Sequence, residues 1–301
     1  MPVIFPPALH PGDTIAIVAT ARKIERDAYS KAIDIFHSWG YKTKVMQNVS
    51  SSFHQFAGTD EERTKGLQDA INDSEVKAVI CVRGGYGSLR IIDQIDFSSL
   101  EKNPKWIGGY SDITVIHNHL LSQHHIASLH CTMPVNMASN SPEALETFKL
   151  LLEGKKPEYE IKAHSYNRPG TSEGVLCGGN LSLICALNGS VSLPDMTGKI
   201  LFLEDLDEYL YHIDRMMLNL KRSGILKKIA GLVVGGFTGM KDNPVPFGKT
   251  AEEIIAEHVS EYNYPVCFGF PAGHMDDNRA LMIGGKVKLS VNIHQTLLQF
   301  L

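Results

Sequence analysis

The chain has 301 residues, of which 43% are hydrophobic, enough to fill one large domain or two ordinary ones. Its 29 Lys and Arg residues are nearly balanced by 33 Asp and Glu residues. Because the basic residues are scattered, neither nucleic acid nor an anionic membrane surface is expected as a partner. The apolar runs have the length of strands, so no membrane-spanning helix is expected.

The first residues, MPVIFPPALHPGD, lack the positive and apolar regions of a secretory signal. Five cysteines are present and none forms a C-x-x-C pair, namely Cys81, Cys131, Cys177, Cys185 and Cys267. Such cysteines are typical of free thiols in a reducing compartment. These features predict a cytoplasmic protein.

Strand and helix patterns alternate through the first half of the chain. Strands are expected at 14–19, 42–47, 76–82, 105–109 and 126–130, and helices at 25–39, from the capping box of Thr59 and Glu62 to about 72, at 88–95 and from Asp112 onward. This alternation predicts a parallel sheet covered by helices on both faces.

A helix capped by Ser141 is expected to end at Gly154, after which the chain becomes polar and proline-bearing over 155–172. This stretch is the predicted linker between an N-terminal α/β domain, 1–154, and a C-terminal domain, 173–301. Strands are expected in the second domain at 174–177, 199–204, 231–236, 265–270 and 286–292, with helices near 180–187, 208–222 and 249–260.

Ser111 lies in the stretch WIGGYSDITVIH, at the joint between an expected strand and an expected helix. A serine there is commonly a helix cap. The preceding Gly108–Gly109 pair instead permits a sharp turn that clears space around the hydroxyl, as in the strand–turn–helix elbow of acyl-transfer enzymes. The G-x-S-x-G pattern itself is not matched, because Ile113 occupies the last glycine position. Cap and nucleophile are both open interpretations.

The turn RGGYG, Arg83 to Gly87, also follows an expected strand. A dinucleotide-binding interpretation is weak because Arg90 stands where a third glycine is required. The turn can be a simple βα connection. Alternatively, the backbone N–H of Gly85 points toward a neighbouring site as one donor of an oxyanion hole.

Two further polar side chains follow strands in the second half. Glu204 closes the strand 199–204, and His274 lies in GFPAGH after the strand ending near Phe270. Either can be structural, and Asp205 competes with Glu204 for a catalytic role. Together with Ser111, however, they supply the nucleophile, base and orienting acid of a serine hydrolase.

Five histidines fall between positions 117 and 130, so a metal site must be considered. His117 and His119 are two residues apart and point to different faces of a helix, and no H-E-x-x-H motif occurs. Metal catalysis and a metal cofactor are therefore not expected.

The ordered set PPALHPGDTIAIVA, RGGYG, GGYSDIT, GVLCGGNLSLI, ILFLEDLDEYLYHIDRMM and GFPAGH resembles the LD-carboxypeptidases, a family that includes murein tetrapeptide carboxypeptidase and the microcin C immunity peptidases. The resemblance implies an N-terminal α/β domain and a smaller C-terminal domain of the swivelling β/β/α type. It implies Ser111 as nucleophile, Glu204 and His274 as its partners, and an oxyanion hole from the N–H groups of Gly85 and Asp112. It also implies a homodimer without a cofactor.

Two features bear on the substrate. The segment His130–Cys131–Thr132 departs from the His-Gly-Pro of many relatives, which puts one pocket wall in doubt, and the short span from Glu204 to His274 is closer to the murein enzyme. We therefore expect release of terminal D-Ala from murein tetrapeptides, with Arg83 a candidate for holding the terminal carboxylate. The alternatives are a microcin C-type peptidase or amidase acting on aminoacyl-nucleotide conjugates, a nucleotide-dependent enzyme, and a non-catalytic ligand-binding protein on the same scaffold.

Overall fold

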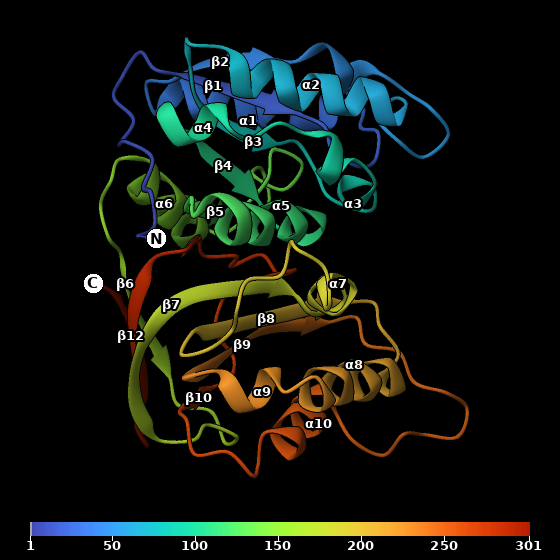
Figure 1. Ribbon diagram of the computed structural model, residues 1–301, viewed down its shortest axis with the longest axis vertical. Coiled ribbons are helices and arrows are strands. Elements are labelled where there is room, and N and C mark those ends of the chain that lie inside the picture. The colour runs from blue at the N-terminus through green and yellow to red at the C-terminus, as the bar shows by residue number, and fades with distance from the viewer. Residues whose placement is uncertain (1) are drawn as a thin grey trace. The chain divides into compact units, whose positions relative to one another are not determined.

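The computed structural model describes residues 2–301 and divides the chain into two compact units. Unit 1 comprises Met1–Lys155 and Asp276–Gly284, and unit 2 comprises Lys156–Met275 and Gly285–Leu301. Figure 1 traces unit 1 from blue to green and unit 2 mainly from yellow to red. Among residues 2–301, no helix is long and apolar enough to cross a bilayer.

Unit 1 is built on a six-stranded sheet in the order β11-β5-β4-β3-β1-β2. All neighbouring strands are parallel except β11, which pairs antiparallel with β5. The strands are β1 (Thr14–Val18), β2 (Lys42–Val45), β3 (Val76–Cys81), β4 (Trp106–Gly109), β5 (Ser128–His130) and β11 (Leu281–Ile283).

The helices of unit 1 connect these strands in the expected alternation. They are α1 (Asp27–Ser38), η1 (Gln47–Ser50), α2 (Asp60–Asn72), α3 (Ser88–Ile91), η2 (Ile92–Gln94), α4 (Ser99–Lys102), η3 (Ser111–Ile113), α5 (Thr114–His119), the π-helical turn η4 (Leu120–His124) and α6 (Pro142–Leu152). The predicted capping box of Thr59 and Glu62 opens α2, and Ser141 caps α6. β1 and β3 are almost wholly buried, as strands covered on both faces must be.

Unit 2 contains a seven-stranded sheet in the order β10-β9-β8-β7-β12-β13-β6. Its strands are β6 (Glu158–Lys162), β7 (Gly170–Asn180), β8 (Ile200–Leu206), β9 (Gly231–Thr238), β10 (Val266–Cys267), β12 (Lys286–Val291) and β13 (Gln295–Phe300). β7 through β10 are parallel, whereas β12, β13 and β6 are antiparallel. The long, curved β7 joins the two parts (Figure 1).

The helices of unit 2 follow the parallel strands and are α7 (Leu181–Leu187), α8 (Leu210–Arg222), α9 (Ile225–Lys228) and α10 (Ala251–His258). The expected class, α/β with two units, is thus confirmed.

The boundaries differ from the predicted ones in two places. Residues 155–172, expected as a linker, contain β6 and the start of β7, because alternate side chains of β6 are buried against the sheet of unit 2. Residues 276–284, expected in the C-terminal domain, return to unit 1, where β11 pairs with β5. The chain therefore passes between the units three times.

Candidate active site

Ser111 follows β4 directly and adopts a backbone φ of +64°. This left-handed conformation is uncommon for a residue with a Cβ, and His54, His125 and Asp207 are the other described residues besides glycine that adopt it. The side chain is 9% exposed and caps no backbone N–H of η3 or α5. Ser111 is therefore not a helix cap in this structure, and its strand–turn–helix setting is similar to the elbow of acyl-transfer enzymes.

The turn that carries Ser111 is supported by the buried side chain of His117. His117 Nε2 lies 2.8 Å from the carbonyl oxygen of Gly109, and its Nδ1 lies 2.9 Å from Ser128 Oγ. Burial lowers the pKa of His117 to about 4, so the ring is neutral at pH 7. Because a carbonyl only accepts, Nε2–H donates to Gly109 and Nδ1 accepts from Ser128. His117 thus fixes the strand end that precedes Ser111.

The loop 83–87 passes close to the same hydroxyl. A Cβ placed on Gly84 would lie 3.1 Å from Ser111 Oγ and 3.3 Å from the backbone nitrogen of Asp112, so a larger residue here would crowd the hydroxyl. The next residue, Gly85, is exposed, has a φ of +116° and uses its N–H in no backbone hydrogen bond of the described residues. Unit 1 therefore brings Ser111, the Gly85 N–H and the N-terminal turn of η3 together.

The side chain of Asp112 fixes this loop from the elbow. Asp112 is 1% exposed, and its Oδ2 accepts a hydrogen bond of 2.7 Å from the backbone N–H of Ser88. Burial raises the pKa of this carboxyl, while the hydrogen bonds from the loop act against that rise. The residue that follows Ser111 therefore anchors the first turn of α3.

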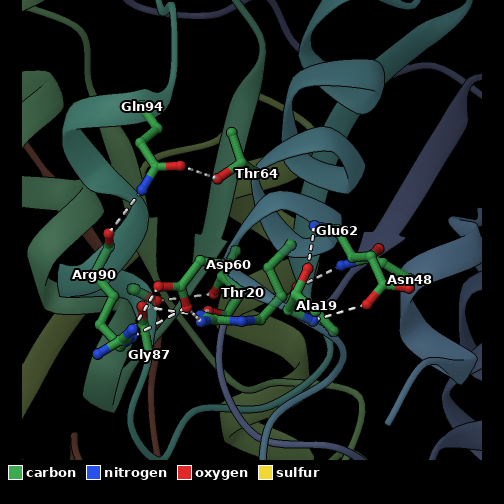
Figure 2. A network of polar contacts seen from close by, with 12 residues as sticks. Ala19, Thr20, Asn48, Asp60, Glu62, Thr64, Gly87, Arg90 and Gln94 are labelled. Carbon is green, nitrogen blue, oxygen red and sulfur yellow. Dashed lines mark hydrogen bonds and ion pairs between the residues drawn. The ribbon is translucent and has the colours of Figure 1, made fainter. Parts of the chain in front are cut away.

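Arg63, which is 0% exposed, fixes the same loop from α2. Its Nη1 donates to the carbonyl oxygens of Thr20 at 2.6 Å and Gly87 at 2.9 Å, and its Nη2 pairs with Asp60. Asp60 also accepts from Arg90, and Figure 2 shows Thr20, Gly87, Arg90 and Asp60 gathered in this network. The buried Arg63 thus ties the Gly87 end of the turn that carries Gly85 to Thr20 and to α2.

Unit 2 brings Glu204 and His274 together. Glu204 lies in β8 and is 0% exposed, and its Oε2 accepts hydrogen bonds from His274 Nδ1 at 2.6 Å and from the His274 backbone N–H at 3.2 Å. Because Nδ1–H is the donor, the neutral ring carries its lone pair on Nε2. The pair has the geometry of an orienting acid and a general base.

The electrostatic surroundings favour a charged imidazole. Burial lowers the pKa of His274, but the attraction and hydrogen bond of Glu204 and the charges of Asp205 and Asp207 outweigh it, so the pKa is raised above 6.5. Asp205 itself is buried and accepts from Asn180 Nδ2 at 2.8 Å and Ser182 N at 2.9 Å. Burial and the neighbouring Glu204 raise the pKa of Asp205 to about 7. Asp205 thus fixes the start of α7 rather than contacting His274.

Two glycines make room for the Glu204–His274 pair. A Cβ on Gly273 would lie 2.7 Å from Glu204 Oε2, and a Cβ on Gly235 would lie 2.5 Å from the carbonyl oxygen of Ala272. Thr238 Oγ1 donates to the His274 carbonyl at 2.9 Å, which ties the histidine loop to β9. The loop is therefore packed directly on the strand beside Glu204.

Arg83 lies at the carboxyl end of β3 in unit 1. Its Nη1 donates to the carbonyl oxygen of Lys23 at 3.0 Å, and its buried Nε has no hydrogen-bond partner among the described residues. It lines a cavity of about 590 Å³ together with Arg22. The structure thus gives Arg83 an anchored guanidinium beside a cavity.

The sequence indicates the polar residues at the strand ends, but it does not reveal the side chains that hold these segments in place. Arg22, Arg63 and the Asp112 carboxylate have no local motif, since each acts on a segment far away in the chain. Ser111, Gly85, Asp112 and Arg83 belong to unit 1, whereas Glu204 and His274 belong to unit 2.

The chain is similar to known proteins in sequence. The sequence model of the LD-carboxypeptidase N-terminal domain matches residues 15–131, and that of the LD-carboxypeptidase C-terminal domain matches residues 173–289. A probable murein peptide carboxypeptidase of Bacillus subtilis is 33% identical over 294 residues, which cover 95% of this chain and 91% of the relative. The murein tetrapeptide carboxypeptidase of Pseudomonas aeruginosa is 28% identical, covering 92% of this chain and 93% of the relative.

Two solved structures have the same fold as this chain. The crystal structure of muramoyltetrapeptide carboxypeptidase from Oxalobacter formigenes superimposes with a TM-score of 0.88 at 32% identity, covering 95% of this chain and 98% of that one. The microcin C7 self-immunity protein MccF in complex with aspartyl sulfamoyl adenosine also has a TM-score of 0.88, covering 98% of each chain, but at 18% identity. The second likeness is one of fold alone.

Proposed function

The chain belongs to the LD-carboxypeptidase family, and from this premise we propose that it releases the terminal D-alanine from murein tetrapeptides by serine catalysis. The observation that carries the catalytic part is the strained, uncapped Ser111 at the end of β4, a conformation that a helix cap does not need. The murein substrate is supported by relatives at up to 33% identity that carry murein names.

The proposed reaction needs the two half-sites to meet. Ser111 Oγ attacks the carbonyl carbon of the bond before the terminal D-residue while His274 Nε2 takes the hydroxyl proton. Glu204 holds the histidine through Nδ1 and stabilises its charged form. His274 lies two residues before Asp276, where the chain returns to unit 1.

The remaining steps complete the turnover. The N–H groups of Gly85 and Asp112 stabilise the oxyanion, each donor lowering the barrier by about 3 kcal/mol. The tetrahedral intermediate expels the amine of D-alanine, which takes the proton from His274, and leaves an ester on Ser111. Water then gives a proton to His274 and attacks the ester, returning the hydroxyl and a free carboxylate. No cofactor enters this scheme.

Incubation of the protein with defined muropeptides, followed by mass spectrometry, tests the proposal. The tetrapeptide should lose one alanine from its carboxyl end, and Ser111→Ala should stop that loss. Unchanged tetrapeptide beside a cleaved aminoacyl-nucleotide conjugate would instead favour the microcin C-type activity. Binding without cleavage of either substrate would favour a non-catalytic protein.

We also propose that the protein works in the cytoplasm as a homodimer. The cytoplasmic proposal is supported by five free cysteines, of which only Cys185 is not buried. The dimer rests on the family resemblance and is tested by light scattering, where a monomer mass would contradict it.

A further inference from the structure

We propose that Arg22 and Arg83 form a binding site for the terminal carboxylate of the substrate, an inference that rests on the proposed carboxypeptidase function. Both line the cavity of about 590 Å³ in unit 1, with Lys23 and one acid, Glu25, also in its wall. A carboxypeptidase must distinguish a chain end from an internal bond, and a carboxylate is what marks that end. A paired guanidinium site supplies the matching charge and donors.

The charges of this site are not neutralised within the protein. Neither Arg22, Lys23 nor Arg83 forms an ion pair among residues 2–301, although Lys23 donates to Ser52 Oγ. The Arg83 Nε is buried without a hydrogen-bond partner. Burial and the nearby charge of Arg22 lower the pKa of Arg83, as expected for two guanidinium groups without an anion between them. A bound carboxylate would relieve the repulsion between the two guanidinium groups.

The site lies next to the proposed nucleophile. Arg22 Nε is 3.1 Å from the position of a Cβ on Gly85, and Ser111 Oγ is 3.1 Å from that of a Cβ on Gly84. Since neighbouring Cα atoms are about 3.8 Å apart, Ser111 Oγ and Arg22 Nε are separated by roughly 13 Å at most. A carboxylate one residue beyond the scissile carbonyl would need its cation about 7 to 10 Å from the attacking oxygen. The required span lies within this upper limit, so the limit is compatible with removal of a single terminal residue.

The anchoring of Arg83 makes it the more rigid member of the pair. Its Nη1 is held by the Lys23 carbonyl, whereas Arg22 is exposed and packs its side chain against Gly85. Arg22 thus contacts the loop that carries the proposed oxyanion donor. A bound carboxylate would order Arg22 and, through it, the backbone of Gly85.

Binding measured without turnover tests this site separately from the reaction. Isothermal titration of the Ser111→Ala protein would use L-Ala-γ-D-Glu-meso-diaminopimelyl-D-Ala and the same peptide with a terminal carboxamide. We expect the acid to bind at least tenfold more tightly than the amide. In the same background, Arg22→Met should reduce this ratio severalfold, and Arg22→Met with Arg83→Met should bring it near one. Arg83→Lys should give an intermediate ratio of acid to amide affinity, because lysine keeps the positive charge but lacks the paired N–H donors of the guanidinium.

Arg222→Met, an exposed change at the end of α8, serves as the matched control and should keep the full ratio. A purely structural role of Arg83 would weaken acid and amide equally and leave the ratio unchanged. Equal binding of acid and amide, no binding of either, or a ratio preserved in the folded double variant would overturn the carboxylate site. If the ratio responds as expected but the protein with Ser111 does not cleave the peptide, the proposed function fails while the site stands.

Discussion

His274 Nδ1 donates a 2.6 Å hydrogen bond to Oε2 of Glu204, a carboxylate with no solvent exposure in the middle of a sheet. The partners are 70 residues apart in the chain, and β8 and β9 with the loop 272–275 bring them together. Glu204 therefore orients the imidazole and favours its protonated form.

Glu204→Gln should lower kcat/KM by at least 100-fold, because the amide neither fixes the same tautomer nor stabilises the imidazolium. Asp205→Asn is the matched control, since Asp205 contacts Asn180 and Ser182 rather than His274. It should lose less than tenfold in kcat/KM. If the Asn variant were the more damaged of the two, Asp205 would be the orienting acid.

The pH profile of kcat/KM should have an acidic limb above 6.5, because the base must be neutral and its pKa is raised. Activity falls as pH drops below that raised pKa. In Glu204→Gln the acidic limb should move to lower pH. Burial lowers the pKa of His274, and the carboxylate that opposes this effect is absent from the variant. The Glu204–His274 pair also stabilises the folded state. This contribution is largest below pH 6.5 and is lost as the pH rises through the raised pKa of His274 in the folded protein. An acidic limb unchanged by the substitution would contradict the pairing.

Gly273→Ala should reduce kcat by 100-fold or more, because its Cβ would lie 2.7 Å from Glu204 Oε2 and displace the carboxylate. Gly189→Ala is the matched control. Gly189 also has a positive φ, +88°, but a Cβ there meets nothing within 4 Å. Both variants therefore share the backbone cost, and only the first should lose activity beyond its loss of stability. Melting curves and initial rates measure the two effects, and equal losses would refute the role of Gly273.

Arg63→Met should destabilise unit 1 by about 3 kcal/mol, because it leaves Asp60 and two carbonyl oxygens without their buried donor. The Gly87 carbonyl should then be released, and kcat should fall in the fraction that remains folded. Lys65→Met, on the exposed side of the same helix, is the control and should change neither quantity appreciably. Denaturant unfolding with parallel kinetics checks both, and an active Arg63→Met protein of full kcat would exclude a positioning role.

The sequence predicted the strand ends well because each polar residue stands directly after an apolar run. The Gly108–Gly109 pair indicated the sharp turn before Ser111, and the structure has that turn with a strained serine. The cap and nucleophile interpretations could not be separated from sequence, since φ and the absent cap bond are three-dimensional facts. The burial of Arg63 could not be predicted from the sequence either, because its hydrogen-bond partners lie on three separate segments of the chain.

The return of residues 276–284 to unit 1 could not be predicted from the sequence, for a physical reason. β11 has only three residues and gains its stability from pairing with β5, more than 140 residues earlier in the chain. β6 reads as part of a linker because two glutamates and one lysine make up most of its five residues, although Tyr159 and Ile161 alternate with them and are buried. Composition therefore gave the crossing near 155 but not the return of 276–284 to unit 1.

In the proposed mechanism, a histidine of unit 2 activates a serine of unit 1. The most direct test is the rate at which a peptidyl phosphonate labels Ser111, located by tandem mass spectrometry, in the unaltered protein and in His274→Ala. We predict a single adduct on Ser111 that forms at least 100-fold more slowly without the imidazole. Equal labelling rates, or an adduct on another residue, would contradict the claim.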